Sequence, residues 1–418
     1  MKYTIVTFGC RVNQADSLRM EEEFHARGAA PAPATEADVI VVNTCSVTAT
    51  ADQGARQTIR RIARENPASE IVVTGCYATR CADDLRALPN VVRVVRNHEK
   101  ERLVGDFQQS SGRASWAARG GDGPCGSAIE PGVAGRTAFT LRVQTGCEER
   151  CAYCIIPSTR GSGRSLSLAG VAREVERVAA AGFKEIALTG VHLGSYGRDL
   201  QPRSSLLEML GMVERLPVDA VFRVSSLEPM DCTPDIVALI ARSGGRFAPH
   251  FHLPLQHASD RVLEAMRRPY TLEYYRRLVD RIRERLPHAS IGSDMIVGFP
   301  GERDEDVGAN ISYLPTSPLT HLHVFPYSDR PGTAASEMGG KVDGVAIRER
   351  GMQLRAIGGE LTRRFQASQR GTIRPGLTLE DGTLVVTDNY LKVRIPPGLG
   401  RNQRVSVRIG ENLSAAVV

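Results

Sequence analysis

Three cysteines lie close together near the middle of the chain. Cys147, Cys151 and Cys154 follow the spacing C-x3-C-x2-C within the segment GCEERCAYCIIPSTRG. Three thiolates on one short loop form half of a disulfide framework, form a metal site that lacks one ligand, or share no function. The chain has 418 residues, of which 42% are hydrophobic, so it can build its cores without disulfides. We expect a cytoplasmic protein, in which thiols stay reduced and clustered cysteines favour metal binding or catalysis.

The spacing favours an iron–sulfur cluster over structural zinc. Zinc needs a fourth Cys or His nearby, and none occurs between Cys154 and His192. A cubane 4Fe-4S cluster ordinarily takes four thiolates, one for each iron. With three thiolates one iron stays open to bind a substrate or cofactor, which turns an electron-transfer cluster into a catalytic one.

Three further cysteines each follow a run of apolar, β-branched residues. Cys10 follows YTIVTFG, Cys45 follows DVIVVNT and Cys76 follows EIVVTG. The segments between them, 14–28 and 49–67, show helical periodicity, so each interval fits one βαβ unit. Parallel strands present their carboxyl ends at one edge of a sheet, where ligands bind in open α/β folds. We therefore expect a shared site, with three ordinary buried cysteines as the alternative.

The N-terminal part is expected to be an open parallel α/β domain over residues 1–104. Residues 105–135 are rich in Gly, Ser and Ala without any period, which is typical of a linker. We expect no role for Cys125 within that segment, nor for Cys81 and Cys232.

Six strand candidates alternate with helix candidates over residues 136–365, which predicts a partial (β/α)6 barrel. The three-cysteine loop follows the first of these strands and is expected at the strand carboxyl ends, where such folds place their chemistry. Residues 366–418 read as short strands with Gly, Asp-Gly and Pro-Pro turns. They predict a small all-β barrel with more basic than acidic residues. It is either a nucleic-acid-binding domain or a plain capping domain.

Charge and hydropathy restrict the remaining possibilities. A formal net charge of +6 permits a nucleic-acid partner without requiring one. No run of apolar residues approaches the roughly 18 needed to span a membrane, so we expect no membrane partner. The apolar run near the N-terminus is too short for a secretory signal.

The segments around the six cysteines resemble the radical SAM methylthiotransferase family. The cysteine motifs are CEERCAYCIIPSTRG, GCRVNQADS, NTCSVT and TGC. The matching barrel motifs are ALTGVHLGSYG, RVSSLEPMD, HLPLQHASDRVLEAMRRPY, DMIVGFPGE and FPYSDRPGTAAS. The last segment resembles the TRAM domain, a small RNA-binding β-barrel. The resemblance covers nearly the whole chain and implies a radical SAM barrel between the α/β domain and a TRAM barrel.

That resemblance implies two 4Fe-4S clusters and S-adenosylmethionine (SAM) as cofactors. Cys147, Cys151 and Cys154 would hold the cluster whose open iron binds SAM. An auxiliary cluster carrying the sulfur to be inserted would be held by Cys10, Cys45 and Cys76. An electron donor such as flavodoxin or ferredoxin would reduce the first cluster, and SAM would yield the radical that attacks a C–H bond. A second SAM would supply the methyl group, and the sulfur donor is not identified by the sequence.

Further positions are implied to bind SAM. Tyr153 would lie against its adenine, and Thr189 and Gly190 would lie beside its methionyl group. The ribose hydroxyls would contact Ser226 and Glu228. Another candidate at a strand end is Asp294. For Gly190 the alternative is a glycine required by backbone geometry alone.

Within the family the chain most resembles enzymes that convert N6-threonylcarbamoyladenosine, in the tRNA anticodon stem-loop, to its 2-methylthio form. Alternatives are isopentenyladenosine in tRNA, an aspartate of a ribosomal protein, or a non-catalytic iron–sulfur RNA-binding protein. The chain departs from the family pattern at His257, which is expected near the active face, and at Arg96, where a glycine is usual. Arg160 and Arg164 are placed to meet tRNA phosphates, or are merely solvated.

Overall fold

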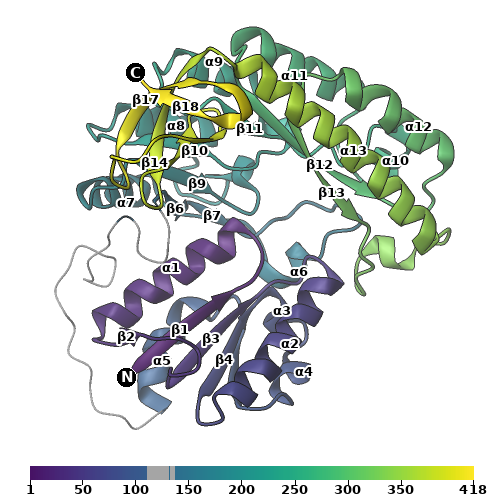
Figure 1. Cartoon of the computed structure of the whole chain (residues 1–418). Helices are drawn as coiled ribbons and strands as arrows, with labels where there is room; N and C mark the ends of the chain where they lie inside the picture. Colours follow the sequence, from purple (N-terminus) through teal and green to yellow (C-terminus); the bar gives the residue numbers. More distant parts are fainter. Residues whose placement is uncertain (111–130, 132–136) are drawn as a thin grey trace.

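The computed structural model describes residues 1–110, 131 and 137–418 (Figure 1). It contains an N-terminal α/β layer structure, a central partial barrel and a small antiparallel sheet at the C-terminus. Residues 105–110, the start of the expected linker, lie in helix α5, and Cys125 lies outside the described residues. In the described part of the chain no helix is both long and apolar enough to span a membrane.

The N-terminal sheet has five parallel strands in the order β2-β1-β3-β4-β5. They are β1 (Lys2–Thr7), β2 (Ala30–Pro31), β3 (Val39–Thr44), β4 (Glu70–Gly75) and β5 (Val91–Val95). Every residue of β3 is buried, because helices cover both faces of the sheet. This arrangement confirms the predicted open parallel α/β fold.

Two layers of helices flank this sheet. Helices α1 (Arg11–Ala26) and α5 (Leu103–Ser110) pack on one face, and α2 (Ala49–Glu65) and α4 (Ala82–Arg86) pack on the other. The hydroxyl oxygen of Thr48 caps α2 by accepting from the Ala51 N–H, at 3.2 Å. Both predicted helices therefore form at the expected places.

The central part contains six parallel strands that form an open, partial barrel. They are β6 (Phe139–Arg142), β9 (Glu185–Thr189), β10 (Val221–Val224), β11 (His250–His252), β12 (Ser290–Val297) and β13 (His321–Pro326). Two three-stranded sheets, β10-β9-β6 and β11-β12-β13, are joined by a parallel bridge between Phe222 and Phe247. All six predicted strands are present.

Helices cover the outside of this barrel (Figure 1). The helices of the central part are α6 (Ile156–Arg160), α7 (Leu168–Ala180), α8 (Leu206–Arg215), α9 (Pro234–Arg242), α10 (Asp260–Ala265), α11 (Leu272–Arg285), α12 (Asp304–Tyr313) and α13 (Gly344–Gln369). A short hairpin of β7 (Gln144–Thr145) and β8 (Arg164–Ser165) brackets the three-cysteine loop. One continuous hydrophobic core joins the strands to these helices.

The C-terminal sheet is antiparallel and strongly curved. Its strands are β14 (Ile373–Leu379), β15 (Leu384–Thr387), β16 (Lys392–Arg394), β17 (Arg404–Ile409) and β18 (Ala415–Val417). They pair in the order β16-β15-β14-β17-β18, and a bridge between Arg394 and Ser414 brings the two edges together. This half-barrel confirms the predicted all-β end of the chain.

The three parts are held together by polar contacts. Helix α1 lies between the N-terminal sheet and β6 (Figure 1). The C-terminal sheet packs near the amino ends of β9 and β10, where Arg404 Nη1 lies 2.6 Å from Asp219 Oδ1 and Asn402 Nδ2 donates to the Gly182 carbonyl at 2.8 Å.

Candidate active site

The three strand-end cysteines meet at the carboxyl edge of the N-terminal sheet. Cys10 and Cys45 follow β1 and β3, the adjacent strands at which the strand order reverses, and Cys76 follows β4. Burial, with the nearby thiols of Cys10 and Cys76, raises the pKa of Cys45 to about 11. Gly9 has φ +91°, and a Cβ there would lie 2.6 Å from Cys45 Sγ, so only glycine fits.

The loop cysteines form a second group at the carboxyl end of the barrel strands. Burial, with the neighbouring thiols of Cys151 and Cys147, raises the pKa of Cys154 to about 12. The loop is anchored by its backbone, since the Cys147 N–H donates to the Gly161 carbonyl at 3.0 Å. No disulfide joins the cysteines in the described ranges.

Cationic side chains contact two of the loop thiols. Arg268 Nη1 donates to Cys151 Sγ at 3.0 Å, and the same guanidinium pairs with Glu228. Burial alone would lower the pKa of His192, but hydrogen bonds to Asp231 and to the Cys147 thiol raise it to about 9. Cationic neighbours favour the thiolate, which is the form that ligates metals.

The donor set fits an iron–sulfur cluster better than a single metal ion. Across residues 1–110, 131 and 137–418, no three His, Cys, Asp or Glu side chains are grouped closely enough to hold one ion. In a cubane cluster each thiolate ligates a different iron, so its three sulfurs stand further apart than around zinc. Each cysteine group supplies three thiols, which suits a cluster with one open iron.

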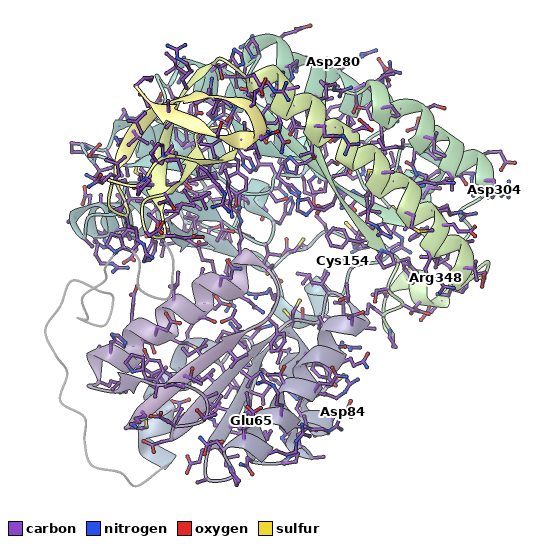
Figure 2. The ribbon with its side chains drawn as sticks, viewed as in Figure 1. Glu65, Asp84, Cys154, Asp280, Asp304 and Arg348 are labelled. Atoms are coloured by element: carbon purple, nitrogen blue, oxygen red, sulfur yellow. The ribbon has the colours of Figure 1, made fainter. Side chains whose placement is uncertain are left out.

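The elements that adjoin the two cysteine groups pack together at the junction of the N-terminal layers and the barrel. Helix α6 follows the three-cysteine loop and packs against α3 (Cys76–Arg80), which begins at Cys76. Asn97 Nδ2 donates to the Thr159 carbonyl at 2.9 Å and lies 3.6 Å from Cys76 Sγ. Figure 2 shows Cys154 at this junction.

Arg160 does not face a phosphate, so that expectation was wrong. Arg160 is only 6% exposed. Its Nη2 lies 2.5 Å from Asn13 Oδ1 and 3.4 Å from Asp16 Oδ2. Asp16 also pairs with Lys100 and Arg142. Burial would raise the pKa of Asp16, but these three cations lower it. The sequence could not reveal that Arg160 meets a carboxylate 144 positions away.

Several positions implied to bind SAM lie at the carboxyl ends of the barrel strands. Ser226 Oγ lies 2.9 Å from His252 Nδ1, and His252 Nε2 lies 3.0 Å from Asp294 Oδ1. These side chains form one hydrogen-bonded row across β10, β11 and β12. Asp294 lies within β12, which continues to Val297, so the expectation that it stands at a strand end was wrong. Thr189 ends β9, and a Cβ on Gly190 would lie 2.9 Å from Gln144 Oε1.

The remaining two implied positions adjoin the loop itself. Tyr153 is half-buried against a cluster that includes Met266 and Phe299. Glu228 pairs with Arg268, so it is linked to Cys151 through that guanidinium. Thus Tyr153 and Glu228 lie beside the loop thiols.

Sequence reasoning missed the polar neighbours of the thiols. Asn97, His192 and Arg268 contact cysteine sulfurs. His192 and Arg268 lie within the family-like motifs ALTGVHLGSYG and HLPLQHASDRVLEAMRRPY, and Asn97 directly follows Arg96, but no role was expected for any of the three. His257, expected near the active face, is fully buried, with its Nε2 3.0 Å from Glu302 Oε1 and 3.0 Å from Asn310 Nδ2. It is therefore a core group and not part of the open face.

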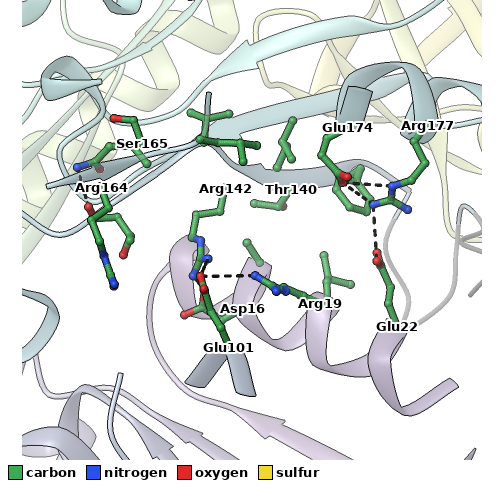
Figure 3. Close-up of a pocket in the computed structure, with 18 residues that line it drawn as sticks. Asp16, Arg19, Glu22, Glu101, Thr140, Arg142, Arg164, Ser165, Glu174 and Arg177 are labelled. Atoms are coloured by element: carbon green, nitrogen blue, oxygen red, sulfur yellow. Dashed lines mark hydrogen bonds and ion pairs between the residues drawn. The ribbon is translucent and has the colours of Figure 1, made fainter. Parts of the chain in front are cut away.

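A cleft of about 460 Å³ lies between α1 and the β6–α7 edge of the barrel (Figure 3). Charged pairs such as Arg142–Glu101 and Arg177–Glu22 cross it, at 3.0 Å and 3.6 Å. None of the six cysteines lines it. The cleft is therefore separate from both cysteine groups.

Comparison with known proteins gives two family matches. Residues 2–96 match the model of an uncharacterized protein family, UPF0004, and residues 141–314 match the radical SAM superfamily. The chain is 33% identical over 400 residues to threonylcarbamoyladenosine tRNA methylthiotransferase MtaB of Bacillus subtilis, covering 93% of this chain and 88% of that protein. For the MtaB protein of Aquifex aeolicus the identity is 35%, covering 94% and 96%.

Other relatives carry a different substrate in their names. A tRNA-2-methylthio-N(6)-dimethylallyladenosine synthase of Parafrankia is 33% identical, covering 86% of this chain and 74% of that protein. Among solved structures, the radical S-adenosylmethionine methyltransferase TsrM from Kitasatospora setae matches with a TM-score of 0.56 at 17% identity, covering 80% of this chain and 76% of that one. At that identity the likeness concerns the fold alone.

Proposed function

The chain belongs to the radical SAM tRNA methylthiotransferases, and from this premise we propose that it converts N6-threonylcarbamoyladenosine beside the tRNA anticodon to its 2-methylthio form. The observation that carries the proposal is the match along nearly the whole of relatives named for that nucleoside, at up to 35% identity. Dimethylallyladenosine, which is the isopentenyladenosine named above, is the second candidate, because relatives named for it reach 33% sequence identity.

Enzymes of the radical SAM family use SAM and 4Fe-4S clusters, and methylthiotransferases carry two such clusters. We assign the SAM-binding cluster to Cys147, Cys151 and Cys154. The auxiliary cluster is assigned to Cys10, Cys45 and Cys76. When bound, these groups would supply reductive SAM cleavage, hydrogen abstraction and the inserted sulfur. The chain's own residues hold the reactants and exclude water.

Side chains around the loop have distinct proposed tasks. Arg268 and His192 hold the thiolates of Cys151 and Cys147 and offset their negative charge. The row of Ser226, His252 and Asp294 offers hydrogen-bonding atoms in the carboxyl halves of β11 and β12 and just beyond β10. We propose that SAM lies there, together with Tyr153, Thr189, Gly190 and Glu228.

The C-terminal sheet is proposed to act as a TRAM-type RNA-binding domain. Lys392 and Arg394 are exposed on β16 on either side of the buried Val393, and Arg408 is exposed on β17. Exposed cations on one small sheet suit the phosphates of an anticodon stem-loop. We also propose a flavodoxin- or ferredoxin-type electron donor and a cytoplasmic location, where tRNA and reduced thiols occur together.

Mass spectrometry of tRNA nucleosides from cells with and without this gene tests the proposal. We expect 2-methylthio-N6-threonylcarbamoyladenosine to disappear and its precursor to accumulate in the deleted strain. Restoring the gene should restore the product. Loss of the methylthiolated dimethylallyl nucleoside instead would replace the proposed substrate with the second candidate. An unchanged nucleoside profile would contradict both.

A further inference from the structure

The inner wall of the barrel carries a row of histidines. His250 and His252 alternate along β11, and His321 and His323 alternate along β13, so each pair faces the same side of its strand. Ring centroids of His250 and His321 lie 6.4 Å apart, those of His321 and His323 lie 5.6 Å apart, and those of His323 and His252 lie 5.6 Å apart. The interior of the barrel is therefore polar and aromatic along β11 and β13.

Tyr390 of the C-terminal sheet ends this row. Its ring centroid lies 4.6 Å from that of His250, and the guanidinium of Arg223 lies 4.8 Å from the ring. The tyrosine has φ +70°, a strained backbone conformation for a side-chain-bearing residue, and it is 40% exposed. Its hydroxyl oxygen accepts a hydrogen bond from Arg11 Nη2 at 3.0 Å. One side chain thus joins the C-terminal sheet, the barrel and the N-terminal domain.

Arg11 brings an uncompensated positive charge to this place. It directly follows Cys10, and in the described part of the chain it forms no ion pair, in contrast to Arg223, which pairs with Glu185 at 2.9 Å. His250 beside it is 5% exposed, and its Nδ1 has no hydrogen-bond partner within the described ranges. A guanidinium that donates to a tyrosine hydroxyl but has no carboxylate partner among the described residues, beside an unsatisfied buried ring nitrogen, indicates a ligand with anionic and polar atoms.

We propose that Arg11, with Tyr390 and His250, binds the carboxylate-bearing substituent on N6 of the substrate adenine, an inference that rests on the proposed function. A threonylcarbamoyl group ends in a carboxylate and a hydroxyl, which suit a guanidinium fork and a ring nitrogen. A dimethylallyl group is apolar, so it would bury the guanidinium without pairing it. Because Arg11 adjoins Cys10, the same contact positions the nucleoside beside the strand-end cysteines.

Equilibrium binding of fluorescent anticodon stem-loops tests this assignment apart from turnover. Three RNAs are compared, carrying threonylcarbamoyladenosine, dimethylallyladenosine or unmodified adenosine at the same position. Arg11→Gln should weaken binding of the threonylcarbamoyl RNA about tenfold, the scale of one lost charge-assisted hydrogen-bonded pair, and should change the other two less than about twofold. Arg11→Lys should keep part of the preference.

Arg19→Gln is the matched control, since Arg19 lies on the same helix but faces the cleft beside Glu101. It should bind all three RNAs as the wild type does. Iron content and thermal stability, measured for each variant, identify any that fail to fold, and Tyr390→Phe then provides a second test, with a smaller loss confined to the threonylcarbamoyl RNA.

The outcomes separate the two proposals. An equal loss for all three RNAs would assign Arg11 to a backbone phosphate and overturn the inference. If Arg11→Gln still prefers the threonylcarbamoyl RNA as strongly as the wild type does, the inference is also overturned. The proposed function would then still stand if the nucleoside profile supports it. A wild-type protein that prefers the dimethylallyl RNA would overturn both the inference and the proposed substrate.

Discussion

Arg268 links the loop thiols to the rest of the site. Its guanidinium contacts Cys151 Sγ, the Glu228 carboxylate and, at 3.1 Å, the Tyr270 hydroxyl oxygen. Burial alone would lower the pKa of Arg268, but the neighbouring Tyr153, Tyr270 and Cys151 raise it, so the side chain stays charged. Only a planar fork can reach all these groups at once.

Arg268→Lys therefore retains the charge but should lose part of this geometry. Loss of a hydrogen-bonding partner behind a metal ligand typically costs 10 to 100-fold in metal affinity or activity, and we expect about 10-fold slower SAM cleavage. Iron content and 5′-deoxyadenosine formation are the measurements. Arg267→Lys, at the exposed neighbouring position, serves as the control and should behave as wild type. Wild-type cleavage by Arg268→Lys would show that the charge alone suffices.

Arg160 is a structural cation at the junction of two parts of the molecule. Arg160→Met would leave the Asn13 Oδ1 atom without its hydrogen-bond donor and would remove one of the cations around the buried Asp16. Breaking a buried ion pair on one side costs about 3 kcal/mol, so thermal unfolding should begin several degrees lower. Arg164→Met, an exposed control four positions later, should unfold as the wild type does. Equal unfolding of both variants would contradict this account.

At the residue scale, the grouping of the six cysteines could be predicted from spacing and from their places after strands. The side chains that contact the thiols could not be predicted. Arg160 and Arg164 look alike in the sequence, yet one is buried and the other exposed, because burial depends on helices brought together from distant segments. The roles of the cysteines remain predictions.

At the scale of elements, the two faces of α1 pack against different parts of the molecule. Phe24 and Met20 pack on the sheet, while Asp16 and Glu22 face the barrel. Burial raises the pKa of Glu22 to about 7 even though Arg177 opposes the shift. This carboxyl therefore makes the α1–α7 contact sensitive to pH.

The sign of that sensitivity follows from the raised pKa. Between the ordinary value of 4.5 and about 7, the unfolded chain releases the Glu22 proton while the folded chain keeps it, so folding stability falls as the pH rises through this window. Glu22→Gln should remove this loss, with a gain of up to about 3 kcal/mol at pH 8 and little change at pH 4.5. Thermal unfolding from pH 4.5 to 8 measures it. Glu176→Gln, exposed on α7, should leave the profile unchanged, and a parallel profile for Glu22→Gln would refute the prediction.

The long strands could be predicted because apolar, β-branched runs ended at turn residues. Helices α3 and α6 are five residues each, too short for a periodic signal. Helix α13 is long, but Gly351, Gly358 and Gly359 interrupt its pattern. Gly358 has a packing reason, since a Cβ there would lie 3.3 Å from Leu322 Cβ on β13.

At the scale of the whole molecule, the C-terminal sheet touches both other parts through Tyr390 and carries exposed cations on β16 and β17. The all-β character of this end could be predicted from its turns. Its docking could not, because Arg404 and Asp219 are far apart in the sequence and neither carries a signal of pairing.

Lys392→Gln combined with Arg394→Gln should weaken tRNA binding and reduce the slope of its salt dependence by about 2, because two phosphate contacts would be lost. Titrations at several salt concentrations measure both quantities. Arg285→Gln, exposed on the outer helix α11, should leave them unchanged. Weaker binding without any change in slope would argue against phosphate contacts at β16.

We propose that the two cysteine groups hold two clusters with different tasks. The most direct test of this proposal is 5′-deoxyadenosine formation by reconstituted Cys147→Ala and Cys10→Ala, with iron counted for each. We expect no SAM cleavage by Cys147→Ala, and continued cleavage without methylthiolated tRNA by Cys10→Ala. Equal loss of cleavage in both variants would contradict the division of tasks between the two groups.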